Sequence, residues 1–221
     1  MPTLDTQRLD SDNRNLVRKI QKALAFIAPK TVPLPTTLFM AGGSLIDLKV
    51  AGWLPVGLVT PDGYEFGRDV SKADVSALGY ASPVRSDVES VARSVKMTAL
   101  ETGKKHMLEL TLGTDLSAVT QTLANGEIVI DEPDLPVGQE YRMLIIGSDG
   151  PAADNWILAR GYGSVKLAST DSQKWGTGDA LQDSLTFDVF TDAVVGVPVK
   201  HYMGGTGAVK NKLALGFTQG S

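Results

Sequence analysis

The sequence has few of the residues from which reactive centres are built. It contains no cysteine and only two histidines, His106 and His201, among 221 residues. Without cysteine the chain has no disulfide, thiolate metal site, iron–sulfur cluster or thiol nucleophile. Two histidines are too few for a metal centre built on several imidazoles. We therefore expect no metal and no cofactor.

Long apolar runs, a secretory signal pattern and a surplus of basic residues are also missing. Apolar stretches such as residues 193–199 are far too short to span a bilayer. The first residues lack the basic-then-apolar pattern of a signal peptide. Lys and Arg number 21 against 25 Asp and Glu, and the formal net charge of -4 argues against a nucleic-acid binder. These features predict a soluble protein without membrane contact, which stays where it is made or is packaged from there.

Catalytic motifs are missing as well. Gly103-Lys104 lacks the upstream glycine and the following Ser or Thr of a phosphate-binding loop, and there is no G-x-S-x-G sequence. Neither histidine has the neighbouring groups that orient a catalytic base. The acidic group Asp131, Glu132 and Asp134 lies beside prolines and is interpreted as a solvated loop, with a weak calcium site as the alternative. We expect a protein that acts through its surfaces and is not an enzyme.

Two segments alternate with the two-residue period of a half-buried strand: residues 88–100 and residues 181–190. Their apolar faces carry Val91, Val95, Met97 and Ala99 in the first segment, and Leu181, Leu185, Phe187 and Val189 in the second. Their polar faces carry Ser90, Ser94, Lys96 and Thr98 in the first segment, and Gln182, Ser184, Thr186 and Asp188 in the second. Shorter strands are predicted over residues 64–66, 127–131, 140–146, 155–158 and 164–168.

The remaining segments divide into turns, loops and helices. Pro61-Asp62-Gly63 predicts a tight turn. Residues 61–87 are predicted to form a long loop that reaches a neighbouring subunit through charges of both signs, on Arg68, Asp69, Lys72, Asp74 and Arg85. A short helix is expected over residues 115–124, whereas residues 104–112 fit a helix or a strand.

The N-terminal segment repeats apolar residues at helical spacing. Leu16, Ile20, Leu24 and Ile27 form one stripe, and Pro29 ends it. Such a helix packs either on its own domain or, as an arm, on a neighbouring subunit, because the two prolines keep residues 30–39 extended. We therefore expect three parts: a helix and extended arm (1–39), a β-domain (40–203) and a glycine-rich, mobile tail (204–221).

The middle of the chain is similar to a known family. The matching stretches are Gly57-Leu-Val-Thr-Pro-Asp-Gly63-Tyr-Glu-Phe66, Arg68-Asp-Val-Ser71, Ala73-Asp74-Val75, Leu78-Gly79, Pro83-Val84-Arg85-Ser-Asp87 and Ser94-Val-Lys-Met-Thr98 with Glu101-Thr102. Their order over residues 50–125 resembles the major tail protein, or tail tube protein, of long-tailed siphophages, especially those of actinobacteria. Residue 78 is Leu where relatives often have Trp, and both termini fall outside the resemblance.

The resemblance implies a structural subunit of the virion, made in the host cytoplasm. Its fold would be a single β-sandwich or barrel with one short flanking helix. Six copies would form a ring, and rings would stack into the tube through which DNA leaves the capsid. Partners would be further copies of the chain, the tape-measure protein, and the tail terminator and distal tail proteins, while genomic DNA passes without specific binding.

Two assignments follow from combining the patterns with this resemblance. The assembly interface is expected at the N-terminal stripe and at the charged residues of 61–87. The lumen wall is expected at the polar faces of the two alternating segments, with Lys96 neutralised by a nearby carboxylate. The alternative function is a β-sandwich receptor- or carbohydrate-binding module of a virion, at the tail tip or as a decoration protein. Only 6% of residues are aromatic, and they are scattered, which disfavours sugar stacking.

Overall fold

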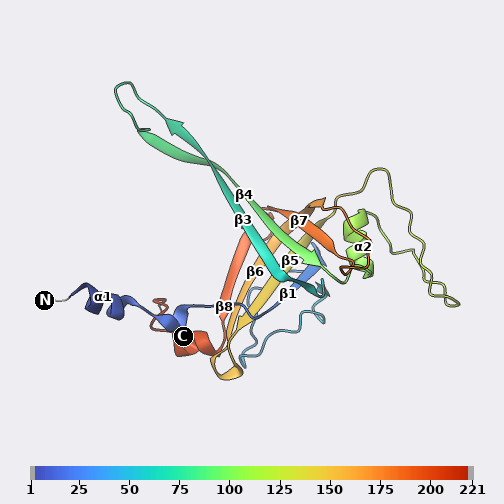
Figure 1. The fold of residues 1–221 in the computed structure, drawn as a ribbon, viewed down its shortest axis with the longest axis horizontal. Coiled ribbons are helices and arrows are strands. Elements are labelled where there is room, and N and C mark those ends of the chain that lie inside the picture. The colour runs from blue at the N-terminus through green and yellow to red at the C-terminus, as the bar shows by residue number, and fades with distance from the viewer. Residues whose placement is uncertain (1–2, 219–221) are drawn as a thin grey trace.

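One antiparallel sheet dominates residues 3–218, the part of the chain that the computed structural model describes (Figure 1). Its strands are β1 (Lys22–Pro29), β2 (Leu54–Pro55), β3 (Val59–Val75), β4 (Arg85–Ala99), β5 (Glu140–Asp149), β6 (Trp156–Thr170), β7 (Asp183–Phe190) and β8 (Val199–Gly204). The order is β2-β1-β5-β6-β7-β4-β3, and β8 pairs with β6 beside this path. The mainly-β prediction is confirmed, but the eight-stranded sheet does not close into a barrel.

Helices are few and short. They are α1 (Leu4–Ser11), α2 (Lys105–Leu112), α3 (Thr206–Lys210) and the 3-10 turns η1 (Arg14–Leu16) and η2 (Ala152–Asp154). α2 is the short flanking helix, and it lies ahead of residues 115–124, where the sequence predicted one. No described helix is long and apolar enough to cross a membrane.

The sheet curls so strongly that its two ends contribute to one core. Ala25 and Ile27 of β1 pack in the same cluster as Val95 and Met97 of β4, and α2 covers one end of that cluster with Met107. At this end the chain between β2 and β3 bridges the gap, since Val56 N donates to Ala25 O (2.9 Å) and Leu100 N to Leu58 O (2.9 Å). Towards the other end, β1 and β3 remain unpaired with each other.

A second core covers the outer face of β1, β5 and β6. Phe26, Leu144 and Ala159 pack there against Leu38 and Trp53 from residues 30–53. The prediction that residues 30–39 leave the domain as an extended arm is therefore wrong: Leu34 and Leu38 are buried, and Tyr202 Oη donates to Pro35 O (2.6 Å). Folding this segment back removes apolar surface on both partners from water.

The N-terminal helix prediction is also wrong. α1 ends at Ser11, and residues 22–29 form β1, which lies inside the sheet between β2 and β5. Residues 25–28 are all buried because both faces of this strand are covered, so a continuous apolar run was mistaken for a helical stripe.

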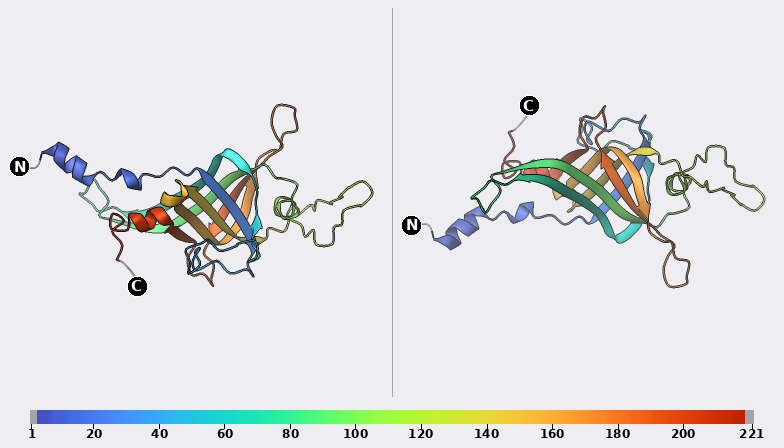
Figure 2. Two further views of the ribbon diagram at one scale, coloured as in Figure 1. Left: turned by 90° about the horizontal axis from the view of Figure 1, so that it is seen from below. Right: turned by 90° about the horizontal axis from the view of Figure 1, so that it is seen from above.

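The sequence predicted a long loop over residues 61–87, but most of this segment belongs to a projecting two-stranded ribbon, residues 68–93. β4 pairs with β7 only from Ser94 onward, so residues 68–75 of β3 and 85–93 of β4 pair with each other alone. Figures 1 and 2 show this ribbon reaching far from the sheet. Pro61-Asp62-Gly63 is no hairpin turn: it lies within β3, where the register shifts between Val59 and Tyr64.

A second projection, residues 114–136, extends beyond α2 on the far side of the molecule (Figure 1). The predicted helix over residues 115–124 and the predicted strand over 127–131 are both absent from it; its residues form turns and irregular chain. Two hydrogen bonds hold the start of the C-terminal segment to residues 152–155: Thr206 Oγ1 donates to Ala152 O (2.9 Å), and Gly207 N donates to Asn155 O (2.9 Å). The last residues of the predicted mobile tail, 219–221, lie outside the described residues.

Candidate assembly surfaces

The polar residues of the two alternating segments meet on one face of β4 and β7. Ser94 lies opposite Asp188, Lys96 opposite Thr186 and Thr98 opposite Ser184. Paired residues of antiparallel strands share a face. Thr98 Oγ1 and Ser184 Oγ are 3.1 Å apart. Ser90 continues the face along β4, whereas Gln182 precedes β7. The reverse face is the buried core of Val95, Met97, Leu185 and Phe187.

This polar face carries both signs of charge. Lys96 faces Glu65 across the β3–β4 pair, and Asp188 faces Lys166 across the β6–β7 pair. Glu65 is the cross-strand neighbour of Lys96, but the two form no ion pair among the described residues, so neutralisation of Lys96 stays a prediction. An acidic excess, as expected for a wall that repels DNA, is not evident on this face.

The charged residues expected at an interface lie on the projecting ribbon. Arg68, Asp69, Lys72, Asp74 and Arg85 are all exposed there. Arg85 Nε contacts Asp87 Oδ2 at 2.6 Å, while Arg68 lies opposite Arg93, a like charge. Like charges directly opposite each other destabilise a strand pair unless a further group compensates them. A two-stranded ribbon is itself marginal in water without packing on one face.

The four residues of the N-terminal stripe are separated by the fold. Ile27 is fully buried in the inner core, Leu24 is 57% exposed on β1, and Leu16 lies in η1. Ile20 precedes β1 and lies near Gly147, where an added Cβ would come 2.9 Å from Ile20 Cγ2. They form no common surface, so the stripe cannot act as one docking face.

An ionic cluster with two buried and two exposed members, which sequence reasoning missed, ties three distant segments together. Asp192 is 3% exposed and Arg142 is 5% exposed. Lys30 Nζ lies 2.7 Å from Glu140 Oε2 and 3.1 Å from Asp192 Oδ2, and Arg142 Nη2 lies 3.8 Å from Asp192 Oδ1. Arg142 Nη1 also donates to Val32 O at 2.7 Å. The cluster thus fastens residues 30–32 and the chain after β7 to the sheet.

The local environment explains the ionisation of this cluster. The backbone N–H of Val195 and the Lys30 ammonium hold the pKa of Asp192 below its ordinary value. Hydrogen bonds from Lys30 and Ser164 lower the pKa of Glu140, and the two carboxylates raise the pKa of Lys30. All three groups therefore carry charge at neutral pH.

Polar contacts also join the chain around β2 and β3 to residues 101–106, at a junction called the seam below. Glu101 Oε1 accepts a hydrogen bond from Leu58 N at 2.7 Å, and its Oε2 lies 2.7 Å from Lys104 Nζ. The Lys104 ammonium, followed by this backbone N–H, lowers the pKa of Glu101. His106 Nε2 lies 2.9 Å from Pro55 O, which places that histidine in the same seam.

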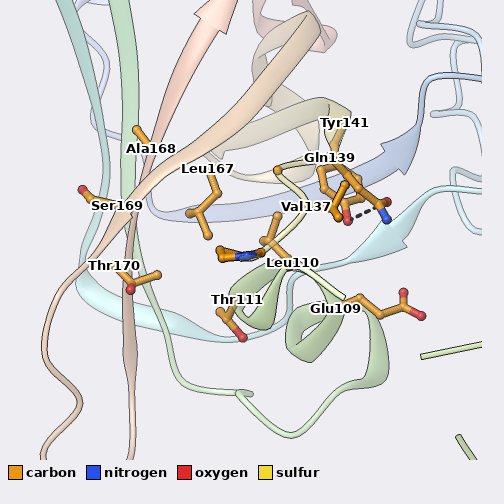
Figure 3. A pocket seen from close by; sticks show the side chains of 13 residues that line it. Glu109, Leu110, Thr111, Val137, Gln139, Tyr141, Leu167, Ala168, Ser169 and Thr170 are labelled. Carbon is orange, nitrogen blue, oxygen red and sulfur yellow. Dashed lines mark hydrogen bonds between the residues drawn. The ribbon is translucent and has the colours of Figure 1, made fainter. Parts of the chain in front are cut away.

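Two cavities lie at opposite ends of the curled sheet. The smaller, about 210 Å³, lies between α2 and the end of β6 (Figure 3). Its wall includes Leu110, Tyr141 and Leu167, and Tyr141 Oη donates to Gln139 Oε1 at 3.3 Å. The larger, about 730 Å³, lies between β1 and β3, and His201 and Arg160 line it. Among residues 3–218, no group of three or more His, Asp or Glu side chains is placed to hold a metal ion.

Comparisons with known proteins add little. No family model matches the sequence, and no curated protein matches it. A solved structure described as the "Cryo-EM structure of the anti-feeding prophage (AFP) baseplate, 6-fold symmetrised" is similar over 86% of this chain and 97% of that chain, at 10% identity and a TM-score of 0.39. Likeness at that level carries no argument about function.

Proposed function

We propose that this chain is the structural, non-enzymatic subunit of a phage tail tube, in which copies form stacked rings around a DNA conduit. The sequence resemblance over residues 50–125 supports this, because most of its motifs fall on β3, on β4 and on the turn that joins them at the tip of the ribbon. In the proposed assembly the ribbon contacts a neighbouring copy, and the polar face of β4 and β7 lines the lumen. The ring is six-fold, as in the resembled family.

The observation that carries the proposal is the unsupported ribbon. Residues 68–75 and 85–93 pair only with each other, and the apolar residues Val75, Leu78, Tyr80 and Val88 along the ribbon are exposed. A subunit that acted alone would gain no stability from this long ribbon, which nothing in the described chain packs against. Packing by a neighbour supplies the missing contacts and removes the exposed strand edges.

The other proposed partners follow from the same assembly. The tape-measure protein would fill the lumen before ejection, and tail terminator and distal tail proteins would bind the two ends of the tube. The virion is then the place of action, and genomic DNA passes without specific contacts.

Shortening the ribbon tests the proposal. Because Arg68 lies opposite Arg93, replacing residues 69–92 by Asn-Gly would join the strands through a two-residue turn. The variant should unfold cooperatively at a midpoint close to that of the parent, yet form no rings or tubes in electron micrographs. A companion variant with Arg68, Asp69, Lys72 and Asp74 replaced by Ser keeps the ribbon and isolates the contribution of its charges.

The outcomes separate the candidate functions. Tubes formed normally by the shortened chain would refute the assigned role of the ribbon. A parent chain that stays monomeric at all concentrations and binds glycans or a cell surface would favour the receptor-binding alternative.

A further inference from the structure

The curled sheet has two free strand edges that face each other across a groove. The groove, about 730 Å³, lies between residues 20–23 and residues 59–66, and parts of β5, β6 and β8 line it. On the edge of β1 that faces the groove, Ala25 O accepts a hydrogen bond from Val56 N. Backbone N–H and C=O groups alternate in direction along a strand, so those of Ala23 point to the same edge, and no strand pairs with them there in the described chain. β3 pairs only with β4 in the described chain, so its edge on the groove is free as well.

The groove combines an apolar lining with an uncompensated cation. Ile145, Leu158 and Phe66 supply the apolar part, and the Arg160 guanidinium lies 3.9 Å from the centre of the Phe66 ring. Arg160 forms no ion pair within residues 3–218. Burial and the charge of Arg160 lower the pKa of His201, so that side chain is neutral at pH 7.

Further polar groups in the groove lack partners. The hydroxyls of Tyr64 and Thr60 are buried, and within the described chain neither has a hydrogen-bond partner. Lys22 and Arg160 outnumber the single acidic residue of the lining, Asp62. The groove therefore suits an extended segment that is apolar and carries a carboxylate.

Such a segment occurs in the projection beyond α2. Residues 127–132 read Glu-Ile-Val-Ile-Asp-Glu, a strand pattern that forms no strand in this structure. Ile128 is 49% exposed and Val129 is 70% exposed. No backbone N–H of residues 128–136 donates to a backbone carbonyl within the described chain. In an extended conformation Ile128, Ile130 and Glu132 share one face, which presents two apolar side chains and one carboxylate.

We propose that residues 127–132 of one copy add as a strand to the groove between β1 and β3 of a second copy. Ile128 and Ile130 lie on the apolar lining, and the Glu132 carboxylate pairs with the Arg160 guanidinium. Val129 and Asp131 face outward.

The position of donor and groove makes the contact intermolecular. The projection leaves the body at Gly113 and returns at Val137, next to the start of β5, whereas the groove reaches Gly147 near the end of β5. The donor of one copy therefore lies at the opposite end from its own groove. A head-to-tail contact of this kind repeats from copy to copy. The contact rests on the proposed function, because it would be one of the contacts between copies in the tube.

A peptide of residues 126–137, labelled with fluorescein, tests the docking directly by anisotropy titration against the whole chain. We expect saturable binding that weakens at least tenfold with Arg160→Glu and recovers when the peptide carries Glu132→Arg. Asp131→Arg in the peptide is the matched control, because that side chain faces outward, and it should change affinity less than about threefold. The proposal would be overturned if the peptide showed no saturable binding, or if Glu132→Arg and Asp131→Arg changed its affinity for the parent chain equally.

Cross-linking tests the same contact with Arg160 intact, in case Arg160→Glu fails to fold. The chain has no cysteine, so Ala23→Cys and Ile130→Cys in separate copies give one thiol each. Mixed and treated with a short bismaleimide, they should yield a covalent heterodimer. Leu78→Cys, at the exposed tip of the ribbon, should not couple to Ala23→Cys; coupling there in place of Ile130→Cys would assign the groove to the ribbon and overturn the proposal.

The two assays separate this inference from the proposed function. Peptide binding without any tube formation would keep the docking and refute the tube. Tubes without peptide binding or cross-linking would keep the tube and refute the docking.

Discussion

Removal of the Asp192 carboxylate gives the sharpest test of the fold, because this group holds several segments at once. Its Oδ1 accepts from the backbone N–H groups of Val194 (3.0 Å) and Val195 (2.9 Å), while Lys30 and Arg142 lie beside it. Asp192→Ala leaves two backbone N–H groups without an acceptor and the buried Arg142 guanidinium without its carboxylate. Breaking a buried pair in this way costs about 3–5 kcal/mol. Asp192→Asn keeps the Oδ1 acceptor but removes the charge and puts an amide NH2 group, which cannot accept from Lys30, in place of Oδ2, so we expect about half of that loss.

Urea unfolding followed by tryptophan fluorescence measures these changes, because Trp53 and Trp156 are buried. At pH 7 a chain of this size should lose roughly 2–4 °C of melting temperature per kcal/mol. The pKa of Asp192 is lowered in the fold, so its charge stabilises the protein above the ordinary Asp pKa of about 3.9. That stabilisation is lost as pH falls through the lower folded pKa, and the gap between parent and Asp192→Asn should close there. A loss below about 1 kcal/mol for Asp192→Ala, or a gap that persists at acid pH, would refute the reasoning.

Three further predictions concern the core, the seam and the polar face. Ile27→Ala should lower the free energy of unfolding by about 2–5 kcal/mol in urea, whereas Leu24→Ala, on an exposed side chain, should change it by less than about 1 kcal/mol; equal losses would contradict the burial described. Glu101→Ala should accelerate hydrogen exchange at the amide of Leu58, which otherwise donates to that carboxylate. Ser94→Cys should react with both small and PEG-linked maleimides in the monomer, but only with the small reagent in tubes; equal access to the large reagent would place this face outside the lumen.

The long alternating strands could be predicted from sequence because each has one polar, solvent-facing side and one buried side. β4 and β7 lie within a few residues of the predicted segments, and the predicted polar residues share one face. β5 was predicted over residues 140–146 as a short strand, although its residues 142–145 are all buried and show no two-residue period. β6 was divided in two, since Gly161 and Gly163 interrupt its pattern. Those glycines are needed by the fold: a Cβ at Gly163 would lie 2.8 Å from the Cβ of Asp192.

The N-terminal strand could not be predicted in this way, because its burial comes from elsewhere. β1 is covered on one face by the inner core and on the other by residues 30–53, so four successive side chains are buried. A continuous apolar run has no two-residue period, and spacing alone does not separate it from a helix. The ionic cluster left no sequence signal either, since Lys30, Arg142 and Asp192 are brought together only by the sheet.

Residues 127–132 show the opposite case, a strand pattern without a strand. Their three consecutive β-branched side chains are strand-like, yet no strand pairs with them in the described chain. Such a mismatch between local preference and observed structure marks a place where a second molecule can complete the fold. The ribbon formed by β3 and β4 is a similar case, because its two strands pair with each other but no other part of the described chain packs against them.

Cryo-electron microscopy of the purified chain at increasing concentration tests the central claim most directly. The account predicts six-fold rings that stack into a tube, with the ribbon between neighbouring copies and the polar face of β4 and β7 towards the lumen. A protein that remains monomeric at every concentration, or rings whose lumen is lined by α2, would contradict it.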